Sequence, residues 1–226
     1  MVHSATLPPL VRGTWYPMSW EKFLEWSPDE GQAEWIDGKG IAYVSNSARH
    51  MRMLGFLAEL FRVYVRVLDL GEVFFDSMLL RLPTRPPGRM PDIFIIGRSD
   101  QERLRDQWFE GPALLVVEFV SDESVQRDLI EKRDEYERAG VPEYLAIDTR
   151  LDRQGFTYLQ LDHEGRYQPI KPDADGRYHS AALSGFWIDP AWFRQDPLPS
   201  VERLMVQIAP RAYRRYLAQL LVESDE

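Results

Sequence analysis

The chain has 226 residues, of which 44% are hydrophobic and 28% charged, as is typical of a globular protein with one large domain or one domain and an appendage. A formal net charge of −9 excludes a surface that is basic overall, so nucleic-acid binding would need a local basic patch. The absence of cysteine excludes disulfides and thiolate metal sites, and no stretch approaches the roughly 18 apolar residues of a membrane span.

The first 17 residues predict an extended, proline-containing segment without the hydrophobic core of a secretion signal. Together with the lack of cysteine, this suits a reducing cytoplasm, where we expect the protein. Ser19 can cap a short helix that carries Trp20 and Phe23. Asp37-Gly38 then lies between two short apolar runs, a strong signal for a β-hairpin.

Two polar residues in this part of the chain have alternative interpretations. Glu34 lies in the first strand of the predicted hairpin, where it is either solvated or part of a site. Residues 47–68 predict a long helix whose buried face includes Leu54 and Leu57. His50 falls on that face, either as a hydrogen-bonded core residue or as a proton-transfer group.

The next elements are short. Residues 71–83 predict one strand with mixed alternation, and residues 84–89 a turn-rich basic link. Asp92 begins an apolar strand that ends near Gly97. Residues 98–110 are polar and predict a loop or a short helix.

The central stretch predicts a strand, a helix and a second strand. Residues 113–117 are a continuous apolar run, typical of a strand covered on both faces, and Glu118 stands at its carboxyl end. Residues 121–124 supply polar helix-start residues, and Gly140 can end the helix. Residues 144–147 form the next strand, so the unit predicts a right-handed crossover between parallel strands.

Lys132 lies on the apolar stripe of this predicted helix. Steps of four, three, four and three residues connect Val125, Leu129, Lys132, Tyr136 and Ala139. Asp128, four residues before the lysine, borders the same stripe. The ammonium either snorkels out to water or stays beside the sheet, and the nearby Glu118 favours a buried lysine in an active site.

The C-terminal third predicts strands followed by helices. Residues 156–162 and 166–171 form a predicted hairpin, and residues 200–222 a helical segment broken at Pro210. This last segment carries Arg211 and Arg214. It could mediate dimerisation, contact DNA or cover the core, and we favour the last.

Two carboxylates mark the chemistry. Asp92 opens one apolar strand and Glu118 closes another, so neighbouring parallel strands could bring them together around a divalent cation. Such a cation lowers the pKa of a bound water and neutralises phosphate charge. An ammonium such as that of Lys132 could orient the water or offset charge in the transition state.

An ordered series of short motifs resembles the Uma-type restriction endonuclease family, within the PD-(D/E)XK nuclease superfamily. The resemblance covers about residues 18–193 and rests on Glu34 to Gly38, His50, Pro91-Asp92, Leu115 to Glu118, Ser121, Asp128, Lys132, Tyr136, Gly140-Val141, Glu143-Tyr144 and the closing FWIDPAWF. It implies an α/β, restriction-endonuclease-like fold with a mixed central β-sheet flanked by helices. We expect strands near Asp76, near Asp92, at residues 113–118 and at residues 144–147 in that sheet.

The resemblance also implies a division of the chain. Residues 18–193 would form the endonuclease-like domain, between the extended segment of residues 1–17 and a C-terminal helical extension of residues 194–226. One departure stands out, because the superfamily usually places lysine two residues after the second acid and this chain has Val120 there. Lys132 can replace it from the helix. The site could also have degenerated.

The implied function is a divalent-metal-dependent endonuclease that hydrolyses DNA phosphodiester bonds with Mg²⁺ or Mn²⁺. Asp92 and Glu118 would be the metal ligands, Lys132 would assist the water, and Glu34 and His50 would complete the catalytic set. Truncation of Lys132 is expected to abolish cleavage without loss of stability.

The alternative is a catalytically inactive nucleic-acid-binding or protein-interaction module on the same scaffold. Cleavage of both DNA strands would suit a homodimer, whereas a nickase could be a monomer.

Overall fold

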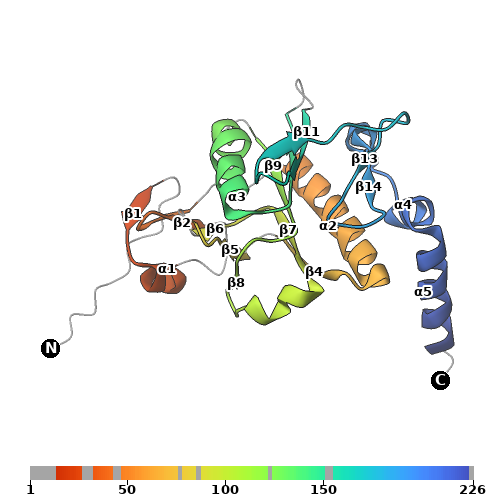
Figure 1. The fold of residues 1–226 in the computed structure, drawn as a ribbon, viewed down its shortest axis with the longest axis horizontal. Coiled ribbons are helices and arrows are strands. Elements are labelled where there is room, and N and C mark those ends of the chain that lie inside the picture. The colour runs from red at the N-terminus through yellow and green to blue at the C-terminus, as the bar shows by residue number, and fades with distance from the viewer. Residues whose placement is uncertain are drawn as a thin grey trace.

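Two six-stranded sheets, with helices packed on them, make up most of the computed structural model (Figure 1). It describes residues 14–26, 33–42, 47–75, 78–84, 88–121, 124–150 and 155–223. Figure 1 shows the N-terminal sheet and α1 at one end, the central sheet between α3 and α2, and α5 at the other end. The expected extended segment before residue 14, the strand position Asp76 and residues 85–87 of the basic link lie outside the described residues. The α/β fold with sheets flanked by helices is as predicted.

The N-terminal sheet forms around the predicted hairpin. Its strands, in spatial order, are β1 (Trp15–Pro17), β3 (Lys39–Ala42), β2 (Ala33–Ile36), β6 (Gly88–Arg89), β5 (Leu79–Arg81) and β8 (Trp108–Glu110). Asp37 and Gly38 both have positive φ, 47° and 80°, as a tight hairpin turn requires. Helix α1 (Trp20–Trp26) buries Trp20 and Phe23 against this sheet, so the predicted short helix and hairpin are confirmed.

The central sheet contains the predicted crossover unit. Its spatial order is β12 (Tyr167–Pro169), β11 (Phe156–Leu161), β10 (Glu143–Asp148), β9 (Leu115–Val120), β7 (Ile93–Gly97) and β4 (Gly71–Phe75). Strands β9 and β10 are parallel, with Glu118 opposite Ala146. Strand β7 is antiparallel to β9, with Ile93 opposite Val117.

Both faces of the central sheet are covered, which explains its continuous apolar runs. On one face Val117 and Phe119 share a core with helix α2 (Ala48–Leu68), whose N-cap Ser47 is the first residue of the predicted long helix. On the other face Val116 and Val120 share a core with residues of the crossover helix. Because side chains alternate along a strand, Glu118 points to the face of the crossover helix.

The crossover helix is partly π-helical. Residues 127–132 form the π-helix η2 (Arg127–Lys132), which continues as α3 (Arg133–Ala139) and ends at Gly140 in a left-handed conformation. Ser124, Asp128, Lys132 and Tyr136, each four residues apart, are buried, whereas Val125 and Leu129 are only partly buried. The prediction that Lys132 faces the sheet is therefore confirmed. Asp128, predicted at the border of the apolar stripe, also faces the sheet, because the π-helix is wider than a regular α-helix.

Two strand predictions were wrong. Residues 71–83 are not one strand, because β4 pairs with β7 in the central sheet and β5 pairs with β6 and β8 in the other. Glu118 is not at the end of its strand, because β9 continues as far as Val120, which pairs with Asp148. The predicted loop or helix of residues 98–110 contains the 3-10 helix η1 (Arg98–Arg103) and β8.

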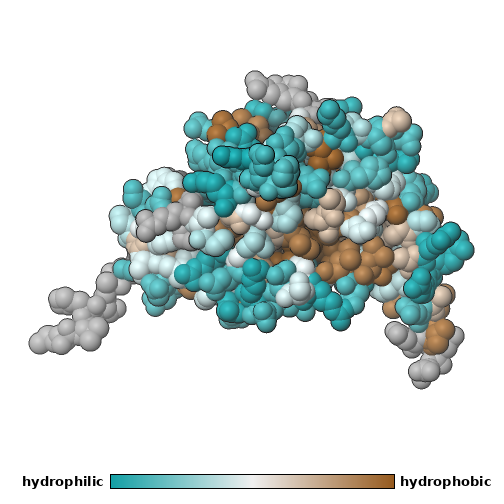
Figure 2. All heavy atoms as spheres, in the orientation of Figure 1, coloured by the Kyte–Doolittle hydropathy of each residue, from teal (hydrophilic) through white to brown (hydrophobic). Residues whose placement is uncertain are grey.

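The C-terminal third packs on the α2 side of the central sheet. After β13 (Tyr178–His179), β14 (Trp187–Ile188) and the 3-10 helix η3 (Pro190–Arg194), it forms α4 (Val201–Ile208) and α5 (Pro210–Glu223). Leu204 and Met205 of α4 join the core beneath α2, so this helix covers the core as predicted. Figure 2 shows hydrophobic residues near α2 and α4 on a face that is otherwise largely hydrophilic. Among the described residues, no helix has the length and hydrophobicity to cross a membrane.

Candidate active site

A buried ion pair joins the central strand to the crossover helix. Lys132 Nζ lies 3.0 Å from both carboxylate oxygens of Glu118, and the hydroxyl of Tyr136 donates to Glu118 Oε1 at 2.9 Å. Lys132 and Glu118 are only 3% and 2% exposed. The snorkelling interpretation of Lys132 is therefore wrong, and its ammonium lies beside the sheet.

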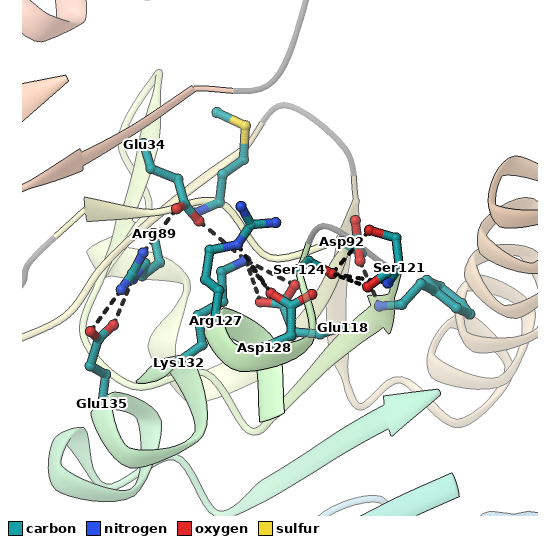
Figure 3. Close-up of polar contacts among 12 residues, drawn as sticks. Glu34, Arg89, Asp92, Glu118, Ser121, Ser124, Arg127, Asp128, Lys132 and Glu135 are labelled. Carbon is teal, nitrogen blue, oxygen red and sulfur yellow. Dashed lines mark hydrogen bonds and ion pairs between the residues drawn. The ribbon is translucent and has the colours of Figure 1, made fainter. Parts of the chain in front are cut away.

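Two further carboxylates contact the same ammonium. Glu34 Oε1 lies 3.2 Å and Asp128 Oδ1 3.6 Å from Lys132 Nζ. Figure 3 shows the carboxylates of Glu34, Glu118 and Asp128 gathered around Lys132. Glu34 comes from β2 of the N-terminal sheet and is 1% exposed, so the solvated interpretation of this residue is wrong.

Arg89 holds Glu34 in place through the carboxylate oxygen that does not contact Lys132. Its Nη1 donates to Glu34 Oε2 at 2.9 Å, while its Nε and Nη2 donate to the two carboxylate oxygens of Glu135 at 2.6 and 2.7 Å. The backbone N–H of Met90 donates to the other oxygen of Glu34 at 3.2 Å. Sequence reasoning placed Arg89 in a basic link and missed it. The available signal was Glu135, three residues after Lys132 and thus near the same helix face.

Asp92 lies at the other end of the site. It directly precedes β7, and its Oδ2 accepts a hydrogen bond of 2.6 Å from the N–H of Phe119 in β9. The prediction of parallel neighbours was wrong. Strands β7 and β9 are antiparallel, which is why the start of one lies beside the end of the other.

His50 approaches Asp92 from the first turn of α2. Its Nε2 lies 3.4 Å from Asp92 Oδ1, is buried, and has no hydrogen-bond partner among the described residues. The ring also contacts Phe119 edge-on, at 5.4 Å between centroids. All five residues predicted for the site, Glu34, His50, Asp92, Glu118 and Lys132, therefore line one cleft.

The cleft encloses about 370 Å³ of empty space, part of it open to solvent. Its lining contains four carboxylates, from Glu34, Asp92, Glu118 and Asp128. Two cationic side chains, Lys132 and Arg127, oppose them, which leaves an excess of negative charge when all ionise. Ser121 and Ser124 add hydroxyl groups to the same wall.

Burial and charge shift the pKa values of the central groups. Burial raises the pKa of Glu118 to about 8, because Lys132 only partly compensates and Asp128, Asp92 and Glu34 repel a further negative charge. Burial acts to lower the pKa of Lys132, but the surrounding carboxylates outweigh it and hold that pKa above its ordinary value. The lysine is therefore charged at neutral pH, and Glu118 takes up a proton easily.

These residues fit a divalent cation such as Mg²⁺. Within the described part of the chain, no three or more histidine, aspartate or glutamate side chains are arranged to hold a metal, so protein ligands would be few. Mg²⁺ commonly uses one or two carboxylates and several waters. Asp92 Oδ1 accepts no hydrogen bond from the described residues, and Glu118 is destabilised in its charged form, so both would gain from a cation.

Comparison with known proteins points in one direction. The family model described as "Uma2: Putative restriction endonuclease" matches residues 20–191. The solved structure of a protein described as "a putative nuclease belonging to DUF820", from Anabaena variabilis, superposes with a TM-score of 0.63 at 16% identity. That match covers 78% of this chain and 97% of the other, and it supports the same fold. No curated protein matches the chain.

Proposed function

Because the chain belongs to the Uma2 family of restriction-endonuclease-like proteins, we propose that it is a divalent-metal-dependent endonuclease that hydrolyses DNA phosphodiester bonds. The single observation that carries the proposal is the position of Lys132. A buried ammonium that contacts Glu118, Glu34 and Asp128 in an open cleft has the charge and location to act on a phosphate. A lysine that only stabilised the helix would need neither the cleft nor three acids.

Asp92 and Glu118 are the residues that would hold the cation. Bound there, it would supply a Lewis acid that neutralises phosphate charge and lowers the pKa of a coordinated water. Glu118 would hold the cation through the carboxylate that now contacts Lys132, and because its pKa is raised to about 8, it would have to give up any bound proton to do so. The hydroxyl of Tyr136, which donates to Glu118 Oε1, would keep that carboxylate in place.

Lys132 then orients the attacking water and offsets charge on the phosphate. Water forms the new bond to phosphorus and gives up one proton to solvent, the bond to the leaving oxygen breaks, and that oxygen takes up a proton from solvent. Glu34 positions the ammonium, and Arg89 positions Glu34. His50 orients Asp92 from α2.

Arg89 is better suited to position Glu34 than an exposed arginine would be. It is 2% exposed and bonded to two glutamates, so its position is fixed before any substrate enters. Preorganised charge of this kind costs no reorganisation during the reaction.

The direct test is cleavage of supercoiled plasmid with Mg²⁺ or Mn²⁺, compared between the wild type and Asp92→Asn. We expect nicked or linear DNA from the wild type only with metal, and none from the variant. A wild type that binds DNA but does not cut it with either metal would favour the inactive binding module.

Two further properties belong to the proposal. We place the reaction in the cytoplasm, where Mg²⁺ and DNA are both present. Cutting both strands of a duplex in one binding event takes two copies of the site, so linear products formed without a nicked intermediate should accompany a dimer in light scattering, and nicked products a monomer.

A further inference from the structure

A second pocket lies beside the first turn of α2, where Arg49 precedes His50. It comprises about 270 Å³ of empty space, part of it open to solvent, and is lined in part by Arg49, Arg194 and Asp148, with an apolar wall that includes Met53, Ile147 and Phe193. It shares no lining residue with the cleft around Lys132. The pocket therefore needs an explanation of its own.

Its charge favours an anion. Asp148 is already paired, because Arg150 donates to its Oδ1 from Nε at 2.8 Å and to its Oδ2 from Nη2 at 2.6 Å. Arg49 is half-buried, and its Nε is enclosed without a hydrogen-bond partner among the described residues. An enclosed donor without an acceptor is unfavourable, so a ligand that accepts hydrogen bonds would relieve it.

Arg194 completes the cationic character of the pocket. It is exposed, it ends the 3-10 helix η3, and in the described part of the chain it pairs with no carboxylate. Two guanidinium groups at one pocket are well suited to a phosphate, which they can bind through paired N–H donors. The apolar wall limits water and strengthens that attraction.

The position of the pocket relates it to the candidate active site. Ile147 in its wall is paired with Phe119, which lines the first cleft, and the two parallel strands are about 4.8 Å apart. On α2 the two pockets are lined by consecutive residues, Arg49 and His50. A nucleic-acid strand carries a phosphate about every 3.4 Å of its axis, so one strand could reach both pockets.

We propose that the pocket of Arg49 and Arg194 binds a backbone phosphate of the nucleic-acid strand, within a few nucleotides of the phosphate that enters the Lys132 cleft. The identity of the ligand rests on the proposed function. The pocket would fix the position of the strand, while the cleft around Lys132 carries the chemistry.

The test is DNA binding without metal, so that cleavage plays no part. Fluorescence anisotropy of a labelled duplex is measured over a range of salt concentrations in EDTA, for the wild type, Arg49→Gln, Arg49→Lys and Arg194→Gln. The matched control is Arg62→Gln, an exposed arginine of the same helix about 20 Å along its axis from Arg49. Thermal melting of each variant checks the fold.

We expect Arg49→Gln and Arg194→Gln each to bind several-fold more weakly at low salt and to lower the slope of log affinity against log salt by about 0.9. Arg49→Lys should keep the slope because it keeps the charge, and Arg62→Gln should match the wild type. Unchanged slopes in both glutamine variants, or a wild type that does not bind DNA, would overturn the proposal.

Two comparisons distinguish a failure of the phosphate pocket from a failure of the proposed nuclease function. If inorganic phosphate raises the melting temperature through Arg49 but DNA binding does not depend on Arg49, the pocket takes a small phosphate compound and the backbone assignment is wrong. If the slopes fall as expected while the wild type never cuts DNA, the phosphate pocket stands and the nuclease proposal fails. If the wild type cuts DNA but the salt slopes of both glutamine variants are unchanged, the nuclease proposal stands and the phosphate pocket is wrong.

Discussion

Lys132 Nζ lies 3.0 Å from both oxygens of Glu118, in a position where neither side chain reaches solvent to any extent. The lysine belongs to a helix and the glutamate to the strand before it, so the crossover unit itself brings them together. The ammonium also contacts Glu34 and Asp128, so removal of the lysine should affect stability as well as activity.

Replacing Lys132 with methionine should slow metal-dependent cleavage by roughly 10²–10³-fold, since a preorganised charge is lost. Contrary to the expectation from sequence, it should also lower stability, by about 3–5 kcal/mol near pH 8, because three buried carboxylates lose their cation. The loss should shrink as the pH falls and Glu118 protonates. Plasmid cleavage and thermal melting measure both effects, with the exposed Lys171→Met as the control. Undiminished cleavage would contradict the role of Lys132.

The wild type without metal should lose stability as the pH rises towards 8. The pKa of Glu118 is raised from an ordinary 4.5 to about 8, so the folded state holds an extra proton between these values. The stabilisation is complete below pH 4.5 and lost by about pH 8, at up to roughly 1.4 kcal/mol per pH unit. Chemical denaturation across this range should show the fall in the wild type and a flatter curve in Glu118→Gln. The exposed Glu164→Gln should follow the wild type, and an equal slope in Glu118→Gln would assign the fall to other groups.

Mg²⁺ or Mn²⁺ should raise the melting temperature of the wild type, and more at pH 8 than at pH 6.5, because the cation competes with a proton for Glu118. At a metal concentration 100 times the dissociation constant, the gain is about 2.7 kcal/mol. Asp92→Asn should lose most of this gain, and Asp106→Asn, an exposed aspartate, should keep it. No shift with either metal at millimolar concentration would count against a metal site at Asp92 and Glu118.

His50→Ala should reduce cleavage by about 10–100-fold, less than Asp92→Asn, because the histidine acts on the orientation of a ligand. The concentration of Mn²⁺ needed for half-maximal activity should rise in parallel. His50→Asn, which retains a polar group near Asp92, should recover part of the loss. If His50→Ala changed the maximal rate but not the metal dependence, the histidine would act on the substrate.

Arg89→Leu should cost about 3–5 kcal/mol of unfolding free energy, since Glu34 and Glu135 are left buried without their cation. The additional change Glu135→Leu should restore part of the stability. The matched control is Arg98→Leu, whose ion pair with Asp69 is exposed and should contribute at most about 1 kcal/mol. Chemical denaturation measures all three, and equal effects of Arg89→Leu and Arg98→Leu would contradict the role of the buried cluster.

Local patterns in the sequence were enough to predict the elements that build the site. The apolar run before Glu118, the stop at Gly140 and the hairpin at Asp37-Gly38 all depend on residues close in the chain, and each is found in the structure. The inward orientation of Lys132 followed from spacing alone. The family resemblance, not spacing, joined Glu34 and His50 to Asp92, Glu118 and Lys132 as one candidate site.

What the sequence could not supply depends on contacts between distant segments. Arg89 meets Glu135 and Glu34 across 46 and 55 residues, and no local pattern encodes such pairs. The antiparallel direction of β7 against β9 and the division of residues 71–83 between two sheets are likewise decided by packing. The burial of Asp128 needed the π-helix, which a period of 3.6 residues does not anticipate.

That π-helix makes the site sensitive to the length of the chain. It lets Ser124, Asp128, Lys132 and Tyr136 face the sheet at intervals of four, which a regular α-helix would spread around its axis. Deleting one residue after it, such as Asp134, would shorten the regular helix α3 and turn Tyr136, which donates to Glu118, by about 100° relative to Lys132. Related chains should therefore tolerate a single-residue deletion within residues 127–132, where a regular α-helix would keep Asp128 and Lys132 on one face, better than one between Lys132 and Tyr136.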